Sequence, residues 1–142
     1  MTKSDRWEQL VAFDEELLMG GAILSEWCSF IVREADTAFA NGAYLASILA
    51  AVSGIETYLR SEHSKTGKEP LAELITRADI ASDLKGDLHT LRKYRNKWVH
   101  FDGPWNDMSL LERPEEVERE LECMAFFAAQ VLRRTIYENQ WA

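Results

Sequence analysis

The sequence predicts an all-α protein: an antiparallel up-and-down bundle of about five to six helices. Apolar residues recur at intervals of three and four along almost the whole chain, and alternation with a period of two is nearly absent. Clusters of Gly, Pro, Asn and Asp divide the chain into segments of helical length. A chain of 142 residues fits one domain, residues 1–142, and can bury a hydrophobic core without disulfides or metals.

Three helices are predicted in the first half of the chain, at about residues 4–19, 22–39 and 44–63. Gly20 and Gly21 would end or kink the first helix, and Asn41–Gly42 would stop the second. The spacing places on the inward faces Trp7, Leu10, Val11, Leu17 and Leu18 of the first helix, Ile23, Trp27, Ile31, Ala35 and Ala38 of the second, and Tyr44, Ile48, Val52, Ile55 and Leu59 of the third.

Three further helices are predicted at about residues 70–78, 83–100 and 114–139. Pro70 and Pro114 suit the first turns of the helices that they open. The segment between the last two helices is rich in Gly, Pro, Asn and Asp, so we expect a loop there. In the last helix, acids fill the first turns while Arg133 and Arg134 lie near the end, a polarity that complements the helix dipole.

Composition narrows the classes of function. The net charge of −8 argues against a protein coated in basic surface for nucleic acid. No apolar run is long enough to span a membrane, and the polar N-terminus does not resemble a secretory signal, so a cytoplasmic location is expected. Cys28 and Cys123 both lie in apolar helical patterns and are interpreted as small core residues. No Cys/His spacing suits zinc, and no cofactor or metal is expected.

The predicted helix at residues 83–100 carries an unusual charge on its apolar stripe. Leu84, Leu88, Leu91 and Trp98 follow the spacing of a core-facing stripe, and Arg95 falls in its middle. A buried charge without a partner is expensive. Arg95 is therefore expected to snorkel, to pair with a carboxylate, or to face a second subunit or a ligand phosphate.

A polar stripe runs beside it, made of His89, Lys93, Asn96 and His100 at spacings of four, three and four. Arg92 lies between the two stripes, so cations and histidines gather near one end of the helix. Such a group supplies a proton carrier near neutral pH and positive charge for an anion. In a purely structural interpretation, the lysines are exposed helix formers, His89 is solvated, Asn96 bonds locally and His100 caps the helix.

The helix ends with Arg95-Asn96-Lys97-Trp98-Val99-His100. This segment resembles the Arg-x4-6-His signature of the HEPN superfamily, in which Asn often follows the Arg. The setting is similar too: a motif late in a helix of a small bundle, followed by a loop and a final helix. The resemblance implies a metal-independent endoribonuclease of toxin–antitoxin or phage-defence type, often a homodimer, whose products carry a 2′,3′-cyclic phosphate. It also implies an antitoxin or regulatory protein as a possible partner.

Carried onto this sequence, the resemblance makes His100 the general acid/base, Arg95 the ligand of the scissile phosphate, and Asn96 the residue that orients either of them. The other polar residues near the motif would contact the RNA substrate, namely His89, Arg92, Lys93 and Lys97. Glu56, the only carboxylate within the apolar segment 43–58, is a candidate to orient Arg95 or His100.

Five residues correspond to about 140° of rotation on an ideal helix, so Arg95 and His100 point in different directions. They meet only if Arg95 reaches around, if the helix end distorts, or if they act across a dimer interface. Trp105 and Asp107 in the following loop are interpreted as ordinary loop residues, with a rim of the site as the alternative. A non-catalytic HEPN-like module that binds a partner protein or a nucleotide is the alternative function.

Overall fold

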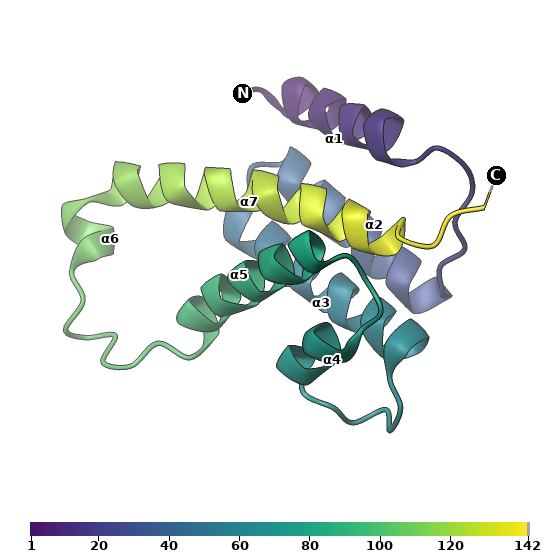
Figure 1. Cartoon of the computed structure of the whole chain (residues 1–142). Coiled ribbons are helices and arrows are strands. Elements are labelled where there is room, and N and C mark those ends of the chain that lie inside the picture. The colour runs from purple at the N-terminus through teal and green to yellow at the C-terminus, as the bar shows by residue number, and fades with distance from the viewer. Residues whose placement is uncertain (142) are drawn as a thin grey trace.

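The computed structural model describes residues 1–141, so Ala142, the last residue of the predicted domain, lies outside the described part. Within residues 1–141 the chain forms seven packed helices, which confirms the all-α bundle (Figure 1). They are α1 (Lys3–Leu17), α2 (Glu26–Ala40), α3 (Tyr44–His63), α4 (Leu71–Arg77), α5 (Ser82–Val99), α6 (Ser109–Glu112) and α7 (Pro114–Ile136). The count exceeds the prediction because a single turn, α6, forms inside the predicted loop. None of these helices combines the length and the apolar character needed to cross a membrane.

Local capping explains where the first helices begin and end. Ser25 accepts a hydrogen bond from the backbone N–H of Cys28 at 3.2 Å, so α2 begins later than its apolar pattern predicts. The predicted stop after α2 is confirmed, because Asn41 is the C-cap and Gly42 adopts the left-handed conformation with φ 76°. α3 follows directly and has the predicted bounds.

The hydrophobic core surrounds α3, which packs against α2, α4, α5 and α7. The predicted inward residues Ile48, Val52, Ile55 and Leu59 are all fully buried. Figure 1 shows α5 and α7 side by side, and the loop after α5 extends away from the bundle before it returns through α6 to α7. The end of α5 and the start of α7 therefore form one edge of the molecule.

The predicted inward faces of α1 and α2 are partly wrong. Trp7 and Val11 are exposed, and α1 instead buries Leu10 and Phe13, the latter edge-on to Phe126 with ring centroids 4.9 Å apart. Ile23 and Trp27 are 80% and 75% exposed. In α2 the buried residues are Cys28, Ala35, Phe39 and Ala40. The later start of α2 puts Ile23 before the helix, and Ala35 is the one residue of the predicted face that is fully buried among residues 1–141.

The structure also corrects the interpretation of Cys123 and of Arg133. Cys28 is buried, as predicted, whereas Cys123 is exposed on α7. Arg133 is only 2% exposed and donates to Asp36 at 2.9 and 2.7 Å and to Asp14 at 2.9 Å. This ion cluster joins α7 to α1 and α2 inside the bundle. Arg133 therefore forms tertiary ion pairs in addition to any interaction with the helix dipole. Burial raises the pKa of Asp36, and the bonds from Arg133 oppose that rise.

The segment after α7 is fastened to the loop after α1. Gly21 and Trp141 exchange backbone hydrogen bonds of 2.8 and 3.0 Å. A Cβ atom at Gly21 would lie 2.4 Å from the Trp141 ring, so any larger residue would displace that ring. Gln140 adds side-chain bonds to the same loop.

Candidate functional site

Helix α5 buries the stripe that its sequence predicts. Leu84, Leu88 and Leu91 are buried, and Trp98 is partly buried against the same core. The helix ends at Val99, and the backbone N–H of His100, the C-cap residue, donates to the Asn96 carbonyl at 2.9 Å. The motif therefore occupies the last turn and a half of α5, at the edge where the bundle meets the following loop.

Arg95 is half-buried and forms no ion pair within residues 1–141. Its Nε donates to the Asn96 side-chain oxygen at 3.0 Å, while the terminal guanidinium nitrogens have no hydrogen-bond partner in that part of the chain. The structural interpretation, in which an internal carboxylate neutralises Arg95, is therefore not what the structure shows. A fixed Nε and two available terminal nitrogens form a fork suited to an oxyanion.

His100 is exposed, and its imidazole forms no hydrogen bond with residues 1–141. The structure thus brings Arg95 and Asn96 together, but it does not join His100 to either side chain. The backbone of His100 has left the helical conformation, with φ −126° and ψ 43°. Within one chain, the expected divergence of Arg95 and His100 remains.

The flanking residues differ in how far they are already engaged. Arg92 donates to His89 Nδ1 at 3.3 Å, so the other ring nitrogen carries the proton and faces Thr76 Oγ1 at 3.2 Å. Burial, together with the nearby cations Arg92 and Lys93, lowers the pKa of His89. His89 is therefore neutral at pH 7 and adds no charge for a phosphate. Lys93 is exposed, whereas Lys97 pairs with Glu120 at 3.4 Å.

Glu56 is not part of this group. Its carboxylate accepts a hydrogen bond from Arg60 at 3.0 Å, one turn further along α3. Neither Arg95 nor His100 bonds to it. In the sequence, Glu56 follows Ile55 and is the only carboxylate of the apolar segment 43–58. Arg60, four residues later, supplies the partner that a carboxylate on a helix surface usually has.

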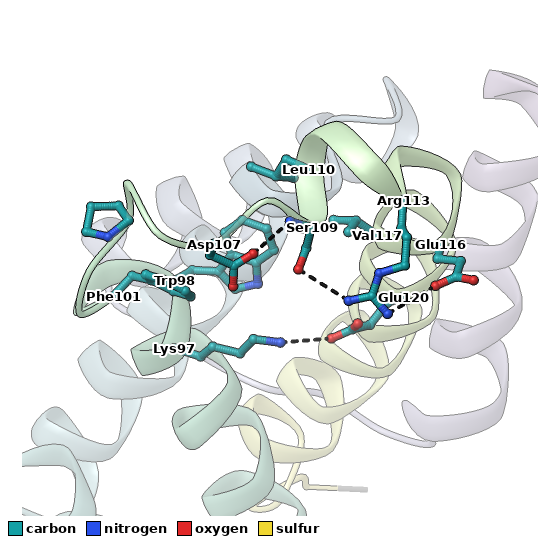
Figure 2. Close-up of a pocket in the computed structure, with 11 residues that line it drawn as sticks. Lys97, Trp98, Phe101, Asp107, Ser109, Leu110, Arg113, Glu116, Val117 and Glu120 are labelled. Carbon is teal, nitrogen blue, oxygen red and sulfur yellow. Dashed lines mark hydrogen bonds and ion pairs between the residues drawn. The ribbon is translucent and has the colours of Figure 1, made fainter.

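A pocket that the sequence did not reveal lies beside the motif, with a volume of about 340 Å³. Figure 2 shows how it opens between the end of α5, the loop with α6, and the first turns of α7. Its lining comprises Lys97, Trp98, Phe101, Pro104, Asp107, Ser109, Leu110, Arg113, Glu116, Val117 and Glu120. Asp107 thus lies on a rim, whereas Trp105 is 93% exposed and outside the lining.

The rim of this pocket is held by charged pairs (Figure 2). Lys97 reaches from α5 to Glu120 on α7, and Arg113 bonds Ser109 at 3.3 Å and pairs with Glu116 at 3.6 Å. Asp107 accepts the backbone N–H of Ser109 at 2.8 Å, and its hydrogen bonds with Ser109 lower its pKa. These contacts join α5 to α7 and hold α6 next to the first turn of α7.

Two buried polar atoms of α5 lack a hydrogen-bond partner within residues 1–141, Trp98 Nε1 and the Tyr94 hydroxyl. Burial and the neighbouring Glu120 raise the pKa of that hydroxyl, and the neighbouring Trp98 side chain opposes the rise. Tyr94 and Trp98 are one turn apart on α5, so both belong to the same side of the helix. Periodicity placed Trp98 on the core stripe but could not show that its N–H would be left without an acceptor.

The resemblance to HEPN proteins rests on the motif and its helical setting. Comparison of this chain with protein-family models, curated proteins and solved structures finds no match. Within residues 1–141, no three His, Cys, Asp or Glu side chains are grouped to hold a metal ion. Arg95, Asn96, His100 and the pocket beside them are therefore the features that bear on a chemical function.

Proposed function

We propose that this chain is a metal-independent endoribonuclease of the HEPN type, acting in a toxin–antitoxin or phage-defence system, with Arg95, Asn96 and His100 as its site. The observation that carries the proposal is the state of Arg95. Arg60 and Arg133 form ion pairs with carboxylates. Two other part-buried arginines have neutral acceptors instead, because Arg6 donates to backbone carbonyls and Arg92 donates to His89. Arg95 is half-buried, oriented by Asn96, and lacks an anionic partner. A phosphate would supply one.

The reaction needs no group that the chain lacks. Neutral His100 removes the proton from a ribose 2′-hydroxyl, and the 2′-oxygen attacks the adjacent phosphorus. The bond between phosphorus and the 5′-oxygen breaks, and a protonated imidazole supplies the proton that this oxygen takes up. The products are a 2′,3′-cyclic phosphate and a 5′-hydroxyl. Arg95 stabilises the charge that develops on the non-bridging oxygens.

Two copies of the chain would complete the site. Arg95 and His100 diverge on α5, and the geometry of one chain does not join them. A two-fold dimer with both α5 ends in one cleft places Arg95 of one copy near His100 of the other. Each Arg95–His100 pair then has one imidazole, which takes the proton of the 2′-hydroxyl and afterwards gives it to the departing 5′-oxygen. The half-buried fork of Arg95 would then face the shared cleft.

Exposed cations beside the motif would hold the RNA backbone. Lys93 is free on the surface of α5, and Arg92 adjoins it. Because the body of the protein is acidic, the basic footprint is small. Each phosphate contact that is lost on a Lys93→Ala change would lower the slope of log affinity against log salt by about 0.7 for single-stranded RNA.

The test is cleavage of labelled single-stranded RNA in excess EDTA, with the product ends identified. We expect 2′,3′-cyclic phosphate ends from the wild type and at least a ~10²-fold loss in His100→Ala, the usual contribution of a general acid/base. His63→Gln is the matched control, because His63 bonds Glu138 and lies outside the site. Equal cleavage by purified wild type and His100→Ala would reject the assignment.

A second candidate function is a non-catalytic module that binds a partner protein. It is favoured by the exposed aromatic side chains at the start of α2, where Trp27 and Phe30 are 75% and 53% exposed. This function predicts that no RNA is cleaved and that Trp27→Ala weakens binding of the partner. Cleavage that depends on His100 and not on Trp27 separates the two.

A further inference from the structure

We infer that the pocket between α5, α6 and α7 binds one unpaired nucleobase of the RNA, next to the phosphate handled by Arg95 and His100. This inference deepens the proposed function and rests on it. Lys97 and Trp98, which line the pocket, lie between Arg95 and His100 in the chain. A nucleotide whose phosphate meets the motif therefore has its base within reach of the pocket.

The size and walls of the pocket suit a flat ring. A volume of about 340 Å³ is at the lower end of the range of small-molecule sites, roughly 300–1,000 Å³. Trp98 and Phe101 provide aromatic surface, and Leu110 and Val117 provide aliphatic surface. Stacking on aromatic side chains is the usual way in which proteins hold unpaired bases.

The charges of the lining favour a neutral ring over a phosphate. Lys97 and Arg113 are already paired with acids of α7, and Asp107 makes the acids outnumber the bases. A phosphate in this pocket would face three carboxylates. The base would thus enter the pocket while its phosphate stays with Arg95, whose terminal nitrogens are available.

The experiment uses the indole N–H signals of the full-length protein in ¹H–¹⁵N spectra. The chain has five tryptophans, so Trp98 is assigned by the signal that disappears in Trp98→Phe. Cytidine, uridine and adenosine are the probes, because nucleosides lack the phosphate that Arg95 would bind. We expect a saturable shift of the Trp98 signal on addition of nucleoside. The same shift should occur in the control variant Trp105→Phe, because Trp105 is 93% exposed in the loop that follows α5.

Leu110→Glu provides a variant that keeps the fold, since Leu110 is 60% exposed at the pocket mouth. We expect it to weaken nucleoside binding about tenfold or more, a loss of roughly 1.4 kcal/mol. Absence of a Trp98 shift at nucleoside concentrations of about 1 mM would overturn the inference.

This test separates the pocket from the proposed catalysis. Nucleoside binding without any RNA cleavage would keep the pocket and reject the nuclease. Cleavage that depends on His100, without nucleoside binding at Trp98, would keep the nuclease and reject the pocket.

Discussion

Replacing Arg95 with methionine should leave the stability of the fold nearly unchanged, whereas the same change at Arg133 should destabilise it strongly. Arg133 is 2% exposed and holds Asp14 and Asp36 through its guanidinium. Its loss leaves two carboxylates without their cation, and Asp36 is largely buried. Removing one partner of a buried ion pair costs about 3–5 kcal/mol.

Arg95 differs in each of these respects. It is half-buried and pairs with no carboxylate in residues 1–141, so no buried charge is left behind when it is replaced. It also lies on the stripe of Leu88, Leu91 and Trp98, where the apolar methionine is compatible. We therefore expect a change of less than about 1 kcal/mol, the range of partly exposed sites without special features.

Thermal unfolding makes the difference measurable. A chain of 142 residues has an unfolding entropy of about 0.3 kcal/mol/K, so a loss of about 3–5 kcal/mol lowers Tm by about 10–17 °C. Arg95→Met should shift Tm by about 3 °C or less on the same scale. Circular dichroism at 222 nm, with urea titration as a second method, would follow both variants.

Arg134→Met is the matched control, because Arg134 neighbours Arg133 but pairs with Asp83 and Asp87 at the surface of α5. Surface pairs contribute about 0–1 kcal/mol each, so its Tm should stay closer to the wild type than to Arg133→Met. A loss of several kcal/mol in Arg95→Met would refute the reasoning, since it would show that Arg95 is needed for the fold.

Further predictions concern the thiols, acid stability and the C-terminal contact. A thiol reagent such as Ellman's reagent should modify exposed Cys123 quickly and Cys28 only on unfolding, because burial raises the pKa of the Cys28 thiol; two fast thiols would contradict this. Hydrogen bonds from Ser64 and Thr66 hold the pKa of Glu69 well below its usual range. The stabilisation it provides is present above the ordinary glutamate pKa of about 4.3 and is lost as pH falls towards the folded-state value. Glu69→Gln should therefore lower the urea midpoint at pH 7 and flatten its fall with acid, and an unchanged pH profile would speak against it. Gly21→Ala should lower Tm because its Cβ would meet the Trp141 ring at 2.4 Å, whereas Gly86→Ala, which meets nothing within 4 Å on helix α5, should not.

Periodicity and punctuation predicted most of this fold because α3 and α5 are buried along one continuous face. Ile48 to Leu59 on α3, and Leu84 to Leu91 on α5, follow the helical repeat and are buried as expected. The outer helices were harder, because α1 and α2 meet the bundle on only part of their surface. Trp27 is apolar and exposed, and spacing alone cannot distinguish it from a core residue.

In the candidate site, too, features set by a single helix could be predicted, and features set by contacts between distant segments could not. The position of Arg95 on an apolar stripe was visible in the sequence, because it needs only the geometry of one helix. The partners of Arg133 and the pocket beside Trp98 were not, since both depend on contacts between segments far apart in the chain. Glu56 has a local partner, Arg60 one turn later on α3, and the spacing of four residues is enough to predict that pair.

The most direct test of a site shared between two chains is an equal mixture of two inactive variants. Arg95→Ala and His100→Ala are each expected to lose RNA cleavage in EDTA. Half of the dimers in an equal mixture contain one copy of each variant, and each such dimer keeps one intact Arg95–His100 pair across the interface. Since half of the dimers then carry one intact site out of two, we expect the mixture to regain about a quarter of the wild-type rate. A mixture as inactive as its components, beside an active wild type, would contradict a site shared between two chains.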